Sequence, residues 1–167
     1  ITAMIRKLLE HDCELGLHGT RNAFLELSAL KDQLASFEHR LGIKLNGVRH
    51  HYLMFRHGET LDAAAAAGLQ YDSTLGFSTR VGFRNGMASP FFPYPSGHDA
   101  GSMVEVPVHF MDTVFVHGGM DNDQLMRQIT ESYLYAKAAR GMFSMLVHPG
   151  SLDAMELPGF RRFYQSL

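Results

Sequence analysis

The sequence predicts an α/β fold built around a parallel sheet. Short apolar segments typical of strands alternate with amphipathic segments of about ten to twenty residues typical of helices. Such alternation indicates βαβ units, in which a helix returns the chain to the start of the next parallel strand. Glycine stands directly after several helical segments, where helices commonly end. The 167 residues fit one domain, so we expect residues 1–167 to form a single domain.

The first elements follow from the spacing of apolar residues. Residues 2–11 predict a helix because their apolar side chains share one face, and residues 14–17 predict a strand that ends at His18. Across residues 24–41, apolar side chains recur at spacings of three and four, which predicts the clearest helix of the chain. Gly42 ends that pattern.

The middle of the chain predicts two more strands, a helix and a long loop. Residues 47–49 are a strand candidate, residues 60–67 a helix closed by Gly68, and residues 69–72 a third strand. Residues 73–102 lack periodicity and are rich in glycine, proline and aromatic side chains. Loops of this length in a compact domain are usually functional or mobile.

The remaining elements complete the alternation. Residues 103–108 predict a strand, with a candidate continuation at residues 113–116. Residues 121–140 predict a helix that opens on an Asp-x-x-Gln capping pattern. Residues 142–147 predict a buried strand, and residues 158–167 a last helix with proline near its first turn.

Composition and charge exclude several function classes. The net charge is −2, from 15 basic and 17 acidic residues, and no run of Lys or Arg exceeds two, so we expect no nucleic-acid partner. No run of 18 apolar residues occurs, so we expect no membrane span. Cys13 is the only cysteine, which rules out an internal disulfide and a thiolate metal cage and fits the cytoplasm. The first residues read as the middle of a helix, which suggests a piece of a longer protein.

Ligand-capable side chains follow four of the predicted strands. They are His18, Arg49 with the adjacent His50 and His51, Asp72, and His148. In parallel (β/α) barrels the carboxyl ends of the strands meet at one rim, so we expect these side chains to converge there. Histidines in loops and at helix ends, such as His109, are given no role.

Several segments resemble the motifs of the polysaccharide deacetylases, carbohydrate esterase family four. Residues 14–20 (ELGLHGT) are similar to the motif that supplies a metal-binding histidine, and residues 49–52 (RHHY) resemble its Arg-x-Pro-Tyr motif. Residues 146–149 (LVHP) are similar to the Leu-x-His motif that supplies the general acid. Segments 68–74, 82–91 and 104–112 are similar to a deacetylase subgroup, so the resemblance runs over nearly the whole chain in the expected order.

The resemblance implies the C-terminal part of a distorted, seven-stranded (β/α) barrel, incomplete at its N-terminus. It implies a metal-dependent hydrolase that removes N-acetyl groups from amino sugars, with a divalent metal, zinc favoured, as cofactor and a carbohydrate as substrate. His148 would be the general acid, Arg49 would orient the general base, and Arg84 would serve the same network or hold substrate. The family's paired aspartates, one of them the base, have no counterpart in this sequence.

Two departures from the family pattern concern the metal. The position four residues after His18, where the family has its second metal histidine, is Asn22, and asparagine is a poor zinc ligand. His51 stands where most members have proline. The hypothesis is that His51 supplies the imidazole that Asn22 does not, giving a metal site of His18, His51 and Asn22.

The aromatic residues near these motifs suggest a sugar-binding wall, although capping of the barrel core explains them equally well. The wall would consist of Tyr52, Phe83, Phe91, Phe92 and Tyr94. Tyr52, Phe91 and Asp72 are the candidate substrate contacts, and Asp72 is alternatively a turn residue or a partner of a metal ligand.

Two other functions compete with the hydrolase. Residues 55–60 (FRHGET) resemble the Arg-His-Gly-Glu-Thr signature of histidine phosphatases, in which His57 would accept a phosphoryl group, although the segment also fits a loop that opens a helix at Leu61. Without the paired aspartates, the chain would alternatively bind sugar or metal without catalysis. Exposed barrel edges would then favour self-association.

Overall fold

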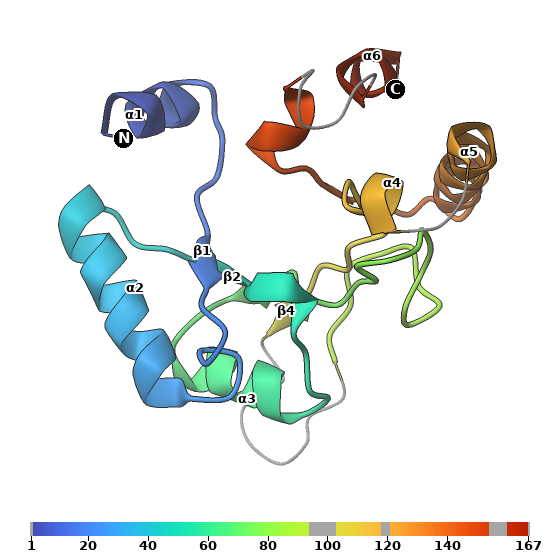
Figure 1. The fold of residues 1–167 in the computed structure, drawn as a ribbon. Helices are drawn as coiled ribbons and strands as arrows, with labels where there is room; N and C mark the ends of the chain where they lie inside the picture. The colour runs from blue at the N-terminus through green and yellow to red at the C-terminus, as the bar shows by residue number, and fades with distance from the viewer. Residues whose placement is uncertain (1, 94–102, 118–120, 154–159, 167) are drawn as a thin grey trace. The chain divides into compact units, whose positions relative to one another are not determined.

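The computed structural model describes residues 2–93, 103–117, 121–153 and 160–166. The chain divides into two compact units. The first unit comprises residues 1–75 and 90–106, and the second comprises residues 76–89 and 107–167. Each unit contains parallel strands and helices (Figure 1), which confirms the mixed α/β class. The division into two compact units does not test whether residues 1–167 form a single domain, which stays a prediction.

The first unit is built on a parallel sheet with the order β1-β2-β3-β4 among the described residues. Its strands are β1 (Leu17–Gly19), β2 (Gly47–His50), β3 (Tyr71–Asp72) and β4 (Val104–Glu105). Its helices are α1 (Thr2–Glu10), α2 (Leu27–Leu41), the 3-10 turn η1 (His51–Leu53) and α3 (Glu59–Ala66). Helix α2 connects β1 to β2 and α3 connects β2 to β3, so both connections are the predicted βαβ crossovers.

The two faces of this sheet have different surroundings. Leu17 pairs in register with Val48, and both pack with apolar residues of α2 and α3. Side chains alternate between the faces of a strand. The neighbouring residues, His18 and Arg49, therefore project from the opposite face. One face of the sheet thus packs against the hydrophobic core, and the other carries His18 and Arg49.

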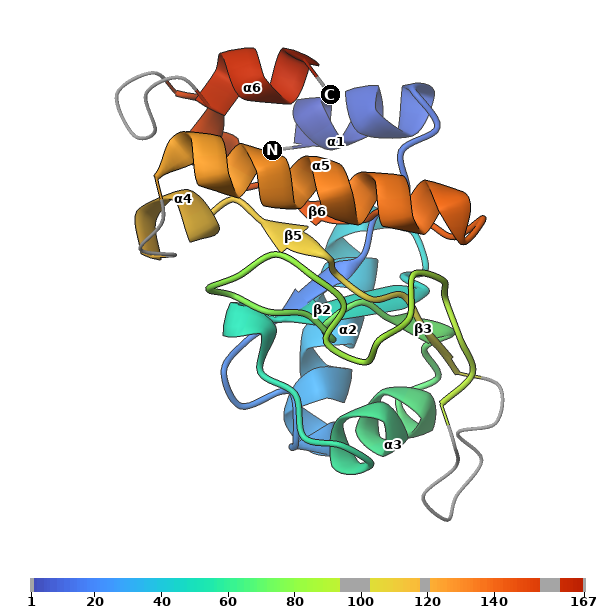
Figure 2. The same cartoon turned by 90° about the vertical axis from the view of Figure 1, so that its right-hand side faces the viewer.

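The second unit contains the parallel pair β5 (Phe110–Met111) and β6 (Met145–Leu146). Its helices are α4 (Val114–His117), α5 (Asn122–Ala138), the 3-10 turn η3 (Pro149–Leu152) and α6 (Phe160–Ser166). Figure 2 shows α5 running along the pair. The core joins Phe110 of β5 to Leu125 and Ile129 of α5 and to Phe160 of α6.

Local signals at helix ends agree with the structure. Gly42 adopts φ +69° and caps α2, and Gly68 adopts φ +83° after α3. Both angles lie in the left-handed region that glycine adopts with the least strain. At the start of α5, the carboxylate of Asp121 accepts a hydrogen bond from the amide of Gln124 at 3.0 Å, which confirms the capping pattern.

The continuation of a strand at residues 113–116 is wrong, because this segment is helical. β5 ends at Met111, and the amide of Phe115 then donates to the carbonyl oxygen of Asp112 at 3.1 Å. Val114 is buried in the core of the second unit. A helical turn therefore buries Val114 and leaves Val116 62% exposed.

The strand predicted at residues 47–49 is β2, which extends one residue further, and the remaining predicted strands are shorter than their apolar segments. Residues 14–17 and 103–108 overlap β1 and β4, and residues 142–147 overlap β6. None of the helices in the described part of the chain is both long and apolar enough to cross a membrane.

Candidate functional site

The ends of β1 and β2 bring two histidines together. His18 lies on β1, and His51 follows β2 directly. Nε2 of His18 lies 3.0 Å from Nδ1 of His51, and the ring planes meet edge to face at 75°. One of the two nitrogens must carry the proton of this hydrogen bond. The structure thus pairs two of the three predicted metal ligands, although 33 positions separate them in the sequence.

The turn after β2 presents His51 through an unusual backbone conformation. Tyr52 and Leu53 adopt φ of 57° and 53°, in the left-handed region that non-glycine residues rarely occupy. The ring of Tyr52 packs 4.1 Å from that of His51, and the guanidinium of Arg21 lies 4.8 Å from the centre of the Tyr52 ring. Strained backbone of this kind concentrates at functional sites.

Asn22 lies in an exposed turn between β1 and α2. Its carbonyl oxygen accepts the amides of Leu25 and Glu26, at 3.3 Å and 3.1 Å. Within the described ranges, no hydrogen bond joins its side chain to the histidine pair, and no group of three or more His, Cys, Asp or Glu residues is placed to hold a metal ion. A ligand role for Asn22 therefore stays a prediction.

The two histidines could provide part, but not all, of the ligands of a metal ion. Two imidazole nitrogens, each about 2.0–2.1 Å from a tetrahedral zinc ion, lie roughly 3.3 Å apart. The 3.0 Å separation of the His18 and His51 nitrogens is close to this value. Neutral imidazoles are good ligands for zinc. His18 and His51 could therefore hold two positions of a divalent metal, whose other ligands would come from elsewhere.

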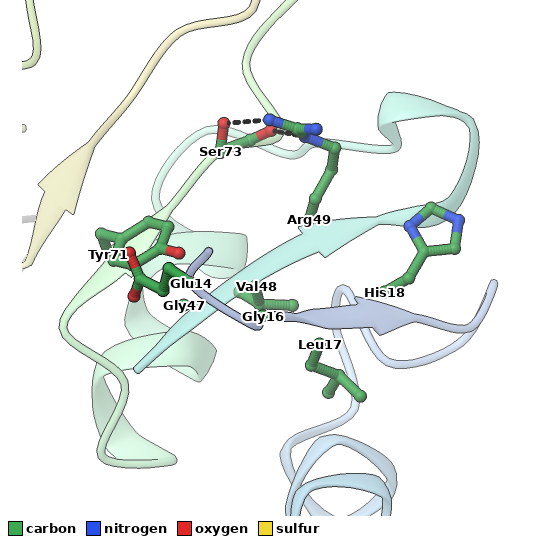
Figure 3. A pocket seen from close by; sticks show the side chains of 9 residues that line it. All are labelled: Glu14, Gly16, Leu17, His18, Gly47, Val48, Arg49, Tyr71 and Ser73. Atoms are coloured by element: carbon green, nitrogen blue, oxygen red, sulfur yellow. Dashed lines mark hydrogen bonds between the residues drawn. The ribbon is translucent and has the colours of Figure 1, made fainter. Parts of the chain in front are cut away.

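Two hydrogen bonds to Ser73 anchor Arg49. Its Nε donates to the Ser73 carbonyl oxygen and its Nη2 to the Ser73 hydroxyl, both at 2.7 Å (Figure 3). Burial lowers the pKa of Arg49, and the negative charge of the Asp72–Glu105 pair opposes this shift. Arg49 therefore remains a cation whose plane is defined by two hydrogen bonds.

His18 and Arg49 open onto a cavity of about 280 Å³ in the first unit (Figure 3). Gly16 and Gly47 leave room for the ring of Tyr71, because a side chain on Gly47 would collide with that ring. Burial, followed by the charge of Glu14 and its hydrogen bond, raises the pKa of the Tyr71 hydroxyl to about 12. The cavity is lined by Glu14, Gly16, Leu17, His18, Gly47, Val48, Arg49, Tyr71 and Ser73.

Asp72 lies on the opposite, helix-covered face and is fully buried, so it does not line the cavity. Its carboxylate accepts the amide of Thr74 at 2.7 Å and the hydroxyl of Thr74 at 2.9 Å. This geometry agrees with the turn-residue alternative for Asp72 and, because the side chain is inaccessible, argues against substrate contact.

Glu105 forms a buried acidic pair with Asp72. One oxygen of Glu105 accepts the amide of Leu75 at 3.0 Å. Burial raises the pKa of both carboxyl groups, and the charge of Asp72 raises that of Glu105 further. At neutral pH, Glu105 is therefore the protonated member, its proton shared with Asp72, and the pair carries one negative charge.

His50 is buried beside this pair, whereas its neighbours Arg49 and His51 reach the other side. Its Nε2 lies 3.9 Å from an Asp72 oxygen, beyond hydrogen-bonding distance, and neither ring nitrogen has a partner among the described residues. Burial, followed by the charge of His18, lowers the pKa of His50 to about 4. His50 is therefore a neutral core residue at neutral pH.

In the second unit, a buried aspartate orients His148. Asp112 accepts the His148 ring Nδ1–H at 2.7 Å with one oxygen and the His148 backbone amide at 2.6 Å with the other. Asp112 is fully buried, whereas 49% of the His148 side chain is exposed. The carboxylate thus assigns the proton to Nδ1 and leaves Nε2 as the outward nitrogen. Asp112 was not predicted, although an acid directly after a strand is the signal that identified the other residues.

Arg84 and the predicted aromatic residues are the remaining candidates. Arg84 is exposed and donates to the carbonyl oxygen of Gly76 at 3.1 Å. Phe91 is half-buried and pairs with Glu105 through backbone hydrogen bonds, while Phe92 is 68% exposed. Phe83 packs against His109 and Tyr135 in the second unit. Tyr94 lies outside the described residues.

The segment with the phosphatase-like signature forms a turn and the start of α3. The amide of Arg56 donates to the Thr60 hydroxyl at 2.9 Å, and its side chain pairs with Glu59 at 3.0 Å. His57 is exposed in this turn. The helix begins at Glu59 and not at Leu61. This geometry favours the loop that opens a helix.

Comparisons with known proteins concern the fold. A scan of protein-family models and a search of curated proteins found no match. The chain is similar to a crystal structure described as a putative polysaccharide deacetylase from Mycobacterium smegmatis, with a TM-score of 0.66 and 18% sequence identity. The match covers 99% of this chain and 60% of that chain, so the chain spans 60% of the length of this structural relative. At this identity, the similarity indicates a shared fold.

Proposed function

We propose that this chain is part of a metal-dependent hydrolase that removes N-acyl groups from amino sugars. The pairing of His18 with His51 is the observation that carries the proposal, because the resemblance implies His18 as a metal ligand and our hypothesis assigns the second imidazole to His51. The similarity to a structure described as a deacetylase supports the same activity class. The substrate would be a carbohydrate.

His18 and His51 would hold a divalent metal, for which we favour zinc. When bound, the metal would polarise the amide carbonyl and lower the pKa of a bound water. The resemblance implies paired aspartates as a further metal ligand and the general base. Arg49, held by Ser73, would orient that base through a charge-assisted hydrogen bond.

His148 would act as the general acid. Its Nδ1 proton is held by Asp112, so Nε2 is the nitrogen that would donate a proton to the leaving amine. The buried negative charge of Asp112 would stabilise the protonated imidazole. In this assignment Asp112 orients the ring of His148, and His148 transfers the proton.

We further propose that the two units are parts of one distorted (β/α) barrel. His18, Arg49 and His148 all lie at or just beyond the carboxyl ends of parallel strands. Closure of a barrel would bring these ends to one rim, where barrel enzymes place their catalytic groups. Self-association through exposed strand edges is an additional expectation, since β1 pairs with β2 alone among the described strands.

Metal analysis tests this proposal. We expect the purified chain, reconstituted with zinc and dialysed, to retain zinc, and a His51→Ala variant to lose most of it. His39→Ala is the matched control because His39 is exposed on α2, away from the strand ends. Equal zinc content and affinity in His51→Ala would refute the metal site.

Activity distinguishes the hydrolase from its alternatives. We expect acetate release from N-acetylglucosamine oligomers to stop after chelation and to return with zinc. Binding of zinc and oligomers without acetate release, including in a polypeptide extended upstream, would favour the non-catalytic binding domain. Chelator-resistant phosphate release that is inhibited by vanadate would favour the phosphatase.

A further inference from the structure

We infer that Ser73 is a positioning residue that fixes the guanidinium of Arg49 beside the cavity of the first unit. The hydrogen-bond geometry carries this inference. Its consequence for catalysis rests on the proposed function. Neither the sequence motifs nor the resemblance assigned a role to Ser73.

Ser73 accepts two hydrogen bonds from one guanidinium. The Nε–H of Arg49 donates to its carbonyl oxygen and an Nη2–H to its hydroxyl oxygen, each at 2.7 Å. Two hydrogen bonds from adjacent nitrogens restrict both the direction of the side chain and rotation about the Nε–Cζ bond. Such bidentate contacts are more specific in geometry than a single contact.

The Ser73 hydroxyl has a defined polarity. It donates its only hydrogen to the carbonyl oxygen of Val106 at 2.8 Å, so its lone pairs remain to accept from Arg49. The Ser73 amide donates to the carbonyl oxygen of Val48 on β2 at 2.8 Å. Ser73 is only 5% exposed. It is therefore held on both sides, by β2 and by the residue that follows β4.

The acceptors on Ser73 are neutral, which matters for the charge of Arg49. The largest negative charge acting on Arg49 comes from the Asp72–Glu105 pair, which is buried on the other face of the sheet. Among the described residues, none accepts a hydrogen bond from Nη1 of Arg49. The two hydrogen bonds from Arg49 to Ser73, called the clamp below, thus orient a cation. They leave Nη1, with its two N–H donors, for a carboxylate or a ligand oxygen at the cavity.

Loss of the clamp is expected to affect turnover more than binding. A guanidinium that rotates freely still supplies positive charge, so substrate affinity changes little. It spends less time in the orientation that the transition state requires, so kcat decreases. This difference between kcat and KM separates positioning from a purely structural role.

The direct test is an NMR measurement of Arg49 in the whole chain. Rotation about its Nε–Cζ bond is followed by exchange between the two Nη resonances, in the unaltered chain and in Ser73→Ala. We expect rotation to accelerate about tenfold or more, the change that corresponds to the loss of one charge-assisted hydrogen bond. Ser73→Cys retains the volume with a weak acceptor, and serves if the alanine variant does not fold.

Thr74→Ala is the matched control. Thr74 is the neighbouring buried residue, and its hydroxyl donates to Asp72 and accepts from the His50 amide without contacting Arg49. We expect a comparable loss of thermal stability and unchanged Arg49 rotation. Unchanged rotation in both Ser73 variants, or an equal acceleration in Thr74→Ala, would overturn the inference.

Kinetics give the functional outcome. With zinc and N-acetylglucosamine oligomers, we expect Ser73→Ala to lower kcat about tenfold with KM within about twofold of the unaltered value. A rise in KM alone would contradict the positioning role in catalysis. Absence of turnover in the unaltered chain would count against the proposed function, and the rotation measurement would then decide on Ser73 by itself.

Discussion

His51 stands where the resembled motif has proline, and this difference changes what the end of β2 can bind. Proline offers no ligand, whereas the imidazole of His51 lies within hydrogen-bonding distance of His18. The left-handed turn at Tyr52 and Leu53 carries a conformational cost of about 1–3 kcal/mol per residue, and the fold maintains it. A second single-residue feature is Asp112, whose two carboxylate oxygens both accept hydrogen bonds from His148.

Asp112→Asn tests the carboxylate that orients His148. An amide has one acceptor oxygen, so one of the two His148 donors would face an NH₂ group and lose its partner. We expect a loss of about 1–3 kcal/mol in the free energy of unfolding and at least roughly a tenfold decrease in the acetate-release rate. Urea denaturation and the hydrolysis assay measure these effects, and Asp123→Asn, exposed at the start of α5, is the control. Full activity in Asp112→Asn would contradict the assignment of His148.

Glu105→Gln tests the buried acidic pair through the pH dependence of stability. The folded chain keeps the Glu105 proton toward about pH 10, while the unfolded chain releases it near the ordinary pKa of 4.5. The folded state therefore binds more protons in this window, and the free energy of unfolding falls as pH rises, by on the order of 1 kcal/mol per pH unit. Glutamine can donate to Asp72 and accept from the Leu75 amide, so the variant should lose less stability between pH 6 and pH 9.

Denaturant titrations across that pH range measure the slope for both proteins. Glu131→Gln, exposed on α5, should retain the slope of the unaltered chain. A Glu105→Gln variant with the same slope as the unaltered chain would show that Glu105 ionises normally in the folded state.

At the scale of elements, the strands are short and the residues at their ends carry the polar chemistry. β3, β4, β5 and β6 each have two residues. The segments around them are held by side chains instead, as Ser73 and Thr74 show in the turn after β3. Glycine has a matching role on β2, where Gly47 makes room for the Tyr71 ring that forms part of the cavity wall.

Gly47→Ala should displace the Tyr71 ring. The added methyl group collides with the ring, so we expect a loss of about 1–3 kcal/mol in the free energy of unfolding. In a Tyr71→Ala background the same substitution should cost much less, because the colliding ring is gone. A double-mutant cycle by chemical denaturation measures this coupling, and additive losses would contradict the contact.

The N-cap of α5 provides a second test at this scale. Asp121→Ala removes the acceptor for the Gln124 amide, and we expect a loss of about 1 kcal/mol in unfolding free energy. Asp121→Asn retains a side-chain oxygen and should remain within about 0.5 kcal/mol of the unaltered chain. Thermal denaturation of both variants compares them, and equal losses would argue against the cap.

At the scale of the whole molecule, the proposal depends on whether the histidine pair of the first unit and His148 of the second share one site. Barrel closure would require it, because both follow parallel strands. The two units each have a core, one joining α2 and α3 to the sheet and one joining α5 and α6 to β5.

Paramagnetic NMR tests this convergence. Cobalt(II) bound at His18 and His51 should broaden or shift the ring resonances of His148 if the barrel closes. The resonances of exposed His39 on α2 provide the reference within the same spectrum. An unchanged His148 signal with cobalt bound would contradict a common site.

The sequence by itself determined the α/β class, most of the order of helices and strands, and the helix ends at Gly42 and Asp121, but it missed β5 and the helical turn that follows β5. These features depend on contacts within a few residues, which periodicity and capping patterns report directly. It also indicated His18 and His51 as partners, through their strand-end positions and the motif resemblance.

Only the tertiary structure decided which polar residues face the cavity and which are buried. Asp72 and His50 carry the same kind of strand-end signal as Arg49 but lie on the helix-covered face. The clamp from Ser73, the pairing of Asp112 with His148 and the helical turn at Val114 all depend on residues brought together across strands or packed into a core. A one-residue shift in register reverses the face of every side chain, and short apolar segments do not specify that register.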